Sequence, residues 1–324
     1  DDEIVKLNVY TDEGTHYFKD KVRHTSINKK YINFYDTNNF EGTIFQTSSL
    51  SNANTFITGS EDEKNEIYSA ITYETELFVP KKLGVYDKGY FLTPFTESSL
   101  FGVHQTHTNI GDYTWDTSDT SHFRVSLIRE DSHSKKAKIQ ITGSFLYLTS
   151  SYINDVYDNE LWNMAVRIRP TLYPIIGNVV TSSSPTYILD FYGVTHVYET
   201  KKKEVHLTAS LSNVSGTAFM TKSKRFFIGA HRENFTGSTL QKCDVKIGGA
   251  RIYLDYIDNG TIAQHNLDPT NYGSRKSYQS PTLFSNKLNL QVPSSELLSL
   301  HWSFGTNTGS DSSGEFIIDD ISSG

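Results

Sequence analysis

Residues 222–273 read KSKRFFIGAHRENFTGSTLQKCDVKIGGARIYLDYIDNGTIAQHNLDPTNYG, and they contain the clearest succession of strands and turns in the chain. The apolar run 226–228 stops at a glycine, as buried strands often do. Residues 244–247 alternate polar and apolar up to Gly248-Gly249, and residues 251–256 alternate again beyond that pair. The pattern predicts separate short strands on either side of the two glycines.

The end of the same segment predicts a turn and then a helix. Asp258-Asn259-Gly260 has the composition of a tight turn, and residues 261–267 have the spacing of about two helical turns. Pro269 comes next as a stop signal. This arrangement indicates the closing end of an all-β module with one short helix.

Short strands recur along the rest of the chain of 324 residues. Aromatic residues make up 13% of it, with 20 Tyr and 19 Phe, which favours strands over helices. The expected strands cover residues 4–10, 31–35, 42–46, 55–58, 67–79, 100–103, 123–129, 138–142, 161–169, 187–192 and 205–211. Within residues 67–79, Ile71, Tyr73, Thr75 and Leu77 share one face. So many strands with one helix predict an antiparallel sandwich or barrel.

Bulk properties exclude several classes of protein. The net charge is −7 and the one basic block is residues 201–203, which argues against nucleic-acid binding. No apolar run approaches 18 residues, so no membrane-spanning segment is expected. The single cysteine, Cys243, rules out an internal disulfide framework and is expected to be a packed core thiol. Because the chain begins at Asp1 and ends without a terminating element, we expect a segment of a longer protein.

The order of the elements resembles the laminin-G-like, concanavalin A-like (lectin-glucanase) jelly roll over about residues 40–273. Trp162 opens one of its strands and is expected to lie in the core. The segments that carry the resemblance are residues 70–79, 99–102, 190–193, 227–230, 235–237 and 251–253, with the short helix that contains Ile262 and His265. Shorter stretches resemble modules in large virion structural proteins of tailed phages, particularly marine ones: residues 230–237, 255–273 and 309–316.

The resemblance implies an all-β fold, an antiparallel β-sandwich of the concanavalin A-like type with one short helix and flanking strands at both ends. We divide the chain into an N-terminal strand and linker (1–30), the sandwich (31–273) and a C-terminal β-hairpin extension (274–324). The function implied is a non-enzymatic structural or appendage module of a phage or virus particle, with glycan-binding capacity. Its expected partners are other copies of itself, other virion proteins and a host-surface glycan. The alternatives are a carbohydrate-binding or adhesion module of a secreted or cell-surface protein and, third, a glycoside hydrolase.

The loop 106–121 is the best glycan-binding candidate in the sequence. Tyr113 and Trp115 offer rings on which sugars stack, and Asp112 and Asp116 offer polar groups for the hydroxyls. The alternative is that Trp115 folds back onto the sheet edge.

Carboxylates and histidines offer weaker candidates for chemistry. A glycosidase needs two carboxylates flanking one bond, but the run 61–66 reads as a solvated acidic loop, and Glu74 and Glu76 read as an outward strand face. His104 and His107, with Asp112, have the residue types of a zinc site but the wrong spacing for a strand. Calcium could use Asp112, Asp116 and Asp119, although Asp is usually a turn former there. We therefore expect no catalytic residue, no bound metal and no cofactor, with calcium as the alternative left open.

Overall fold

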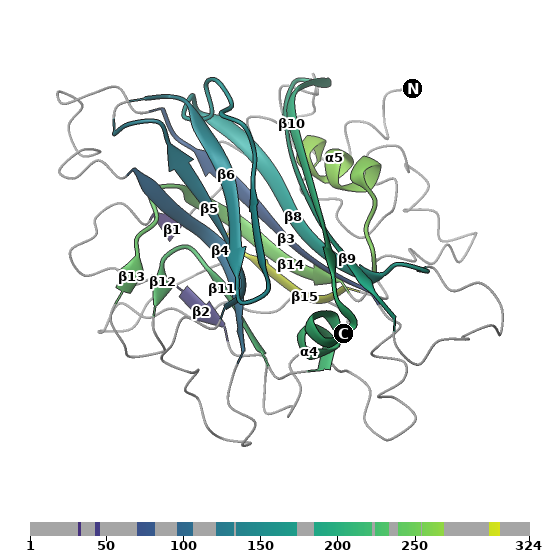
Figure 1. Cartoon of the computed structure of the whole chain (residues 1–324). Helices are drawn as coiled ribbons and strands as arrows, with labels where there is room; N and C mark the ends of the chain where they lie inside the picture. Colours follow the sequence, from purple (N-terminus) through teal and green to yellow (C-terminus); the bar gives the residue numbers. More distant parts are fainter. Residues whose placement is uncertain are drawn as a thin grey trace, which may run out of the picture.

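The computed structural model describes residues 32–33, 43–45, 70–81, 96–105, 121–132, 134–173, 185–221, 224–232, 239–253, 255–268 and 298–304. In this part of the chain, two antiparallel sheets stack face to face, as Figure 1 shows. This confirms the predicted all-β sandwich. The finer assignment to a concanavalin A-like jelly roll stays a prediction.

The larger sheet has seven strands in the order β1-β14-β3-β8-β9-β10, with β15 also paired to β14. Its strands are β1 (Ile32–Asn33), β3 (Ile71–Val79), β8 (Glu160–Pro170), β9 (Tyr187–Val197), β10 (Thr200–Leu211), β14 (Lys246–Tyr253) and β15 (Leu298–Ser303). The smaller sheet has six strands in the order β2-β11-β4-β5-β6-β7. They are β2 (Thr43–Phe45), β4 (Glu97–Gln105), β5 (Ser121–Arg129), β6 (Ala137–Gly143), β7 (Leu146–Thr149) and β11 (Lys224–Ile228). A separate two-stranded hairpin joins β12 (His231–Arg232) and β13 (Thr239–Gln241).

The main core lies between the two sheets. Its centre is aromatic: the ring of Tyr73 lies 5.5 Å from that of Phe123 and 5.6 Å from that of Phe226. Trp162 and Cys243 are fully buried there, as the sequence predicts. Ring pairs at these separations add to the hydrophobic stabilisation of the two facing sheets.

In the part of the chain that the structure describes, two helices accompany the sheets, where the sequence predicts one. The additional helix, α4 (Asn213–Thr221), closes one end of the sandwich and packs Phe219 and Met220 into the core. Its sequence, NVSGTAFMT, is rich in residues with weak helix propensity, so packing rather than local preference stabilises it. No helix in the described part of the chain is long and apolar enough to cross a membrane.

The predicted helix is present as α5 (Asn259–Leu267), but it begins inside the predicted turn. Asp258 is its N-cap, and its side chain accepts a hydrogen bond from the amide of Thr261, while Asn259 and Gly260 form the first turn. The composition typical of a turn is also typical of a helix start, because Asp and Asn satisfy free amide groups in both.

The glycine pair at 248–249 does not separate two strands, contrary to the prediction. Strand β14 runs through both residues, and its register with β3 shifts between Ile247 and Gly249. A bulge accommodates the extra residue there, which is a frequent use of glycine inside a strand.

Strand β15 pairs with β14 along the larger sheet. The rest of the predicted C-terminal hairpin and the N-terminal strand lie outside the described residues. The domain boundaries therefore stay predictions.

One testable consequence concerns Gly143, the last residue of β6. A Cβ atom at this position would lie 2.1 Å from the backbone carbonyl oxygen of His122. Because a strand would have to move, Gly143→Ala is expected to lower the free energy of unfolding by about 1–3 kcal/mol. Urea unfolding would measure this.

Gly260→Ala is the matched control. There the added Cβ would meet a side-chain oxygen of Asp258 at 3.1 Å, and alanine favours the helix. Equal losses in the two variants would contradict the predicted clash at Gly143.

Candidate functional site

Helix α5 covers the outer face of the seven-stranded sheet, and its position creates the candidate site. It packs on β8 and β9, where Ile262 joins Ala165, Tyr192 and Val194 in a second apolar cluster. The chain reaches α5 from the end of β14 through residues 255–258. The start of the helix therefore lies above the end of β8.

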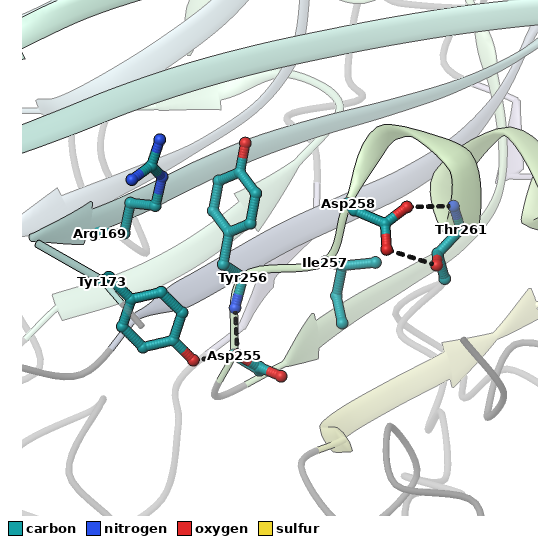
Figure 2. Close-up of a pocket in the computed structure, with 7 residues that line it drawn as sticks. All are labelled: Arg169, Tyr173, Asp255, Tyr256, Ile257, Asp258 and Thr261. Atoms are coloured by element: carbon teal, nitrogen blue, oxygen red, sulfur yellow. Dashed lines mark hydrogen bonds between the residues drawn. The ribbon is translucent and has the colours of Figure 1, made fainter. Parts of the chain in front are cut away.

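A pocket of about 340 Å³ opens at this place, as Figure 2 shows. Arg169 comes from the end of β8, Tyr173 lies just after that strand, and the other lining residues come from the β14–α5 connection and the first turn of α5. We call it the α5 pocket, and its lining residues are Arg169, Tyr173, Asp255, Tyr256, Ile257, Asp258 and Thr261.

Hydrogen bonds to the backbone and to Tyr173 fix Asp255 in the pocket wall. Its Oδ1 accepts from the Tyr173 hydroxyl and from the Tyr256 amide, the latter at 2.7 Å. The hydroxyl of Thr72 donates to the carbonyl oxygen of Asp255 at 2.6 Å and accepts from the amide of Ile257 at 3.1 Å. These bonds hold the connection against β3, so the pocket is largely preformed.

The ring of Tyr256 packs against two guanidinium groups. The central carbon of Arg167 lies 4.6 Å from the ring centroid and that of Arg169 lies 4.9 Å from it. The Tyr256 hydroxyl donates to Asp190 Oδ2 at 3.0 Å, and burial raises the pKa of that hydroxyl. Cation–π contacts at these distances stabilise the ring in one orientation.

Asp258 forms the exposed rim of the pocket. Its two carboxylate oxygens accept from Thr261, from the backbone amide at 2.9 Å and from the hydroxyl at 3.2 Å. The pocket thus combines two tyrosine rings, one partly exposed arginine and two carboxylates within a small hollow. This mixture suits a polyhydroxylated ligand, whose apolar faces pack on rings and whose hydroxyls donate to and accept from polar groups.

Beneath α5 lies a buried ionic cluster of Glu74, Glu76, Arg251, His265 and Asn163. His265 Nδ1 donates to the two oxygens of Glu74 at 2.9 and 3.1 Å, and Asn163 also donates to that carboxylate. Arg251 lies 3.4 Å from Glu74 and 3.7 Å from Glu76. Burial by itself would raise the pKa of Glu74, but His265, Arg251 and the hydrogen bonds outweigh it and lower the value to about 2.

The cluster refines the interpretation of Glu74 and Glu76 as an outward strand face. They do lie on the face of β3 that points away from the main core, but α5 covers that face and both residues are at most 2% exposed. Their carboxylates are bound to Arg251 and His265, and the open pocket does not include them.

The other sequence-predicted site residues mostly fall outside the described part of the chain. This holds for Tyr113, Trp115, Asp112 and Asp116, and also for the acidic loop and for the remaining proposed metal ligands His107 and Asp119. His104 is described, and it is buried with its Nε2 2.5 Å from Nε2 of His231. Among the residues that the structure does describe, no three His, Cys, Asp or Glu side chains gather as a metal site would require.

The residues of the α5 pocket are not predicted from the sequence. The alternating pattern of the sequence predicts that Asp255 and Tyr256 continue the strand, whereas β14 ends at Tyr253. Arg169 reads only as the end of a strand, and Tyr173 lies beyond the proline that stops it. The one available signal is Asp258, whose cap fixes the start of α5 and so brings the connection back over β8.

Comparisons with known proteins yield distant similarities of fold. No family model matches the chain, and no curated protein matches its sequence. Among solved structures, the enzymatically active domain of tailspike protein 2 of bacteriophage CBA120 aligns with 62% of this chain and 25% of its own, at 13% identity and a TM-score of 0.35. The CBM2 module of the evolved Dit protein of Lactobacillus casei BL23 phage J-1 aligns with 59% of this chain and 63% of its own length, at 10% identity and a TM-score of 0.28.

These structural neighbours are phage proteins, and this chain spans a quarter of the first and less than two thirds of the second. Both TM-scores lie below 0.5. Any function has to be inferred from the residues of this chain.

Proposed function

We propose that the chain is a saccharide-binding module without catalytic activity, and that a sugar unit occupies the α5 pocket. The observation that carries the proposal is the composition of that pocket: the rings of Tyr173 and Tyr256 share it with Arg169, Asp255 and Asp258. Its volume of about 340 Å³ is at the lower end of the range of small-molecule sites.

The hydrogen bonding of the pocket carboxylates supports binding over catalysis. The carboxylates of Asp255 and Asp258 accept hydrogen bonds from the protein itself, from Tyr173, the Tyr256 amide and Thr261. A general acid, by contrast, is kept protonated in an apolar environment. The pocket carboxylates therefore suit the orientation of a ligand and the anchoring of the helix.

We also propose, from the sequence resemblance to virion modules, that this module serves in a phage or virus particle together with copies of itself. The edge strand β10 supports such an assembly, because exposed residues recur along its twelve positions and its far side has no sheet partner in the described part of the chain. Light scattering on the isolated chain tests this, and a clean monomer would contradict it.

Removal of side chains from the α5 pocket tests the saccharide proposal. The wild-type protein is expected to bind at least one sugar on an array of bacterial and host glycans. Arg169→Ala and Tyr173→Ala are each expected to weaken that binding about tenfold, by loss of a charged hydrogen-bond donor or a ring. Addition of EDTA is expected to change nothing, since the proposed site needs no calcium.

Leu172→Ala is the matched control, because Leu172 is 69% exposed, adjoins Tyr173 and does not line the pocket. The proposed site would be refuted if the wild type bound no glycan on the array. It would also be refuted if the two pocket variants bound glycans as strongly as the wild type.

A further inference from the structure

A second surface of the protein exposes aromatic side chains, on the outer face of the hairpin β6–β7. Ala137, Ile139 and Ile141 of β6 point into the core, so Lys138, Gln140 and Thr142 lie on the opposite face. The pairings Thr142 with Tyr147 and Gln140 with Thr149 put both β7 residues on the same outer face.

Tyr152 completes this surface, because the Lys138 ammonium lies 5.6 Å from the centroid of its ring. Tyr147 is 64% exposed and Tyr152 is 46% exposed, so both rings are accessible to a ligand. We call this surface the β6–β7 face, with the members Lys138, Gln140, Thr142, Tyr147, Thr149 and Tyr152.

The arrangement of the β6–β7 face alternates rings with hydrogen-bonding groups. The Tyr147 hydroxyl donates to Gln140 Oε1 at 3.3 Å, which braces the ring on the sheet. A protein partner would be matched by a contiguous apolar centre, but here each ring lies beside polar side chains, Tyr147 beside Gln140 and Thr142 and Tyr152 beside Lys138. Rings on a rigid sheet with amide and hydroxyl groups between them suit a chain of sugars.

Charge narrows the class of sugar. Strands β5, β6 and β7 contain no aspartate or glutamate, although the whole chain has a net charge of −7. Arg124 of β5 lies against His231, 3.1 Å from its Nδ1, and in the described part of the chain Lys138 is the cation that contacts a ring of this face. An ammonium group beside the Tyr152 ring suits a carboxylated sugar, whereas nucleic acid would require a cluster of cations.

The extent of the surface indicates a polymer. Residues 138–142 of an extended strand cover about 13 Å, more than one sugar ring. The β6–β7 face also lies on the outer face of the six-stranded sheet, whereas α5 and its pocket lie on the outer face of the other sheet (Figure 1). We propose that the β6–β7 face is a second binding surface, which takes a linear acidic polysaccharide by stacking on Tyr147 and Tyr152 and pairing with Lys138.

Native electrophoresis of the full chain in gels that contain alginate, hyaluronate, polygalacturonate or dextran tests this proposal. At least one of the three acidic polymers is expected to retard the wild-type protein, and neutral dextran is not. Tyr147→Ala and Tyr152→Ala are each expected to raise the dissociation constant at least about fivefold. Lys138→Ala is expected to remove most of the salt dependence of the retardation.

A control variant and a variant of the α5 pocket separate this surface from other parts of the protein. Tyr198→Ala removes a tyrosine that is 55% exposed on the turn between β9 and β10, and it is expected to leave the retardation unchanged. Arg169→Ala is run in the same gels, because it reports separately whether the α5 pocket contributes to the retardation. Each substitution removes a side chain that is exposed or partly exposed. Melting temperatures equal to that of the wild type would show that the variants fold.

Several results would overturn the proposal. These are no retardation by any of the three acidic polymers, equal retardation by dextran, and retardation that persists in both tyrosine variants. Loss of retardation in Arg169→Ala alone would place the polymer in the α5 pocket, which would support the proposed function and reject the second surface.

Discussion

Arg251→Met is expected to lower the free energy of unfolding by about 3–5 kcal/mol, the cost of breaking a buried ion pair from one side. The Arg251 side chain is 2% exposed, and its guanidinium lies 3.4 Å from Glu74 and 3.7 Å from Glu76. Methionine has a similar length, so the variant keeps most of the packing and removes the charge. The two buried carboxylates would then lose the guanidinium that they share, while Glu74 would keep its hydrogen bonds from His265 and Asn163.

A double-variant cycle separates the charge from the packing. Glu74→Gln is expected to cost a similar amount, and the double variant Glu74→Gln/Arg251→Met is expected to cost clearly less than the two singles together. Chemical denaturation at pH 7.5 measures all three. The matched control is Glu130→Gln, which breaks an ion pair with Lys136 that is about half exposed and should change stability by less than about 1 kcal/mol. Full additivity of the singles would contradict the proposed coupling.

Acidification from pH 7.5 to pH 5 is expected to lower the free energy of unfolding by about 4 kcal/mol through His104 and His231. Their ring planes are nearly parallel, at 12° to each other, and the two Nε2 atoms are 2.5 Å apart. Arg124 can only donate, so Nδ1 of His231 accepts from it, and His231 must then donate its Nε2–H to His104. In this arrangement, the protonation of either ring would break one of these hydrogen bonds.

The sign of the effect follows from the pKa values. Burial, followed by Arg124, lowers the pKa of His104 to about 3, while burial, His104 and Arg124 lower that of His231 to about 2. Both unfolded-state values lie near 6.5, so the unfolded chain takes up the protons first. The contribution of the two histidines to the free energy of unfolding is therefore fully present above pH 6.5. It is lost as the pH falls toward their folded-state pKa values, by about 2 kcal/mol per histidine at pH 5.

Urea unfolding at the two pH values checks this prediction. The variant His104→Gln/His231→Gln is expected to lose much less stability on acidification than the wild type, whatever its stability at pH 7.5. His206→Gln, which removes a half-exposed histidine from β10, is expected to behave as the wild type. An equal loss in the double variant would assign the acid sensitivity to other groups. Glu74 acts in a separate window: its contribution is present above pH 4.5 and declines as the pH falls toward 2.

Elements with a strong local pattern are predictable from the amino-acid sequence. Alternation predicts β3 with Ile71, Tyr73 and Leu77 toward the core, because a period of two is a property of an extended chain whatever surrounds it. The helix before Pro269 and the buried positions of Trp162 and Cys243 are predicted by similarly local signals. Helix α4 is not predicted because its residues favour a helix only weakly, and packing of Phe219 and Met220 compensates.

The cover of each sheet face and the meeting of distant side chains depend instead on the tertiary fold. Alternation places Glu74 away from the core, but it cannot show that α5, with His265 191 positions further on, returns to bury it. The α5 pocket and the His104–His231 pair likewise join residues from distant elements. Contacts of this kind depend on the path of the chain between elements, and no local period records that path. Burial, charge pairing and the candidate site therefore emerge only when the two sheets and α5 are assembled.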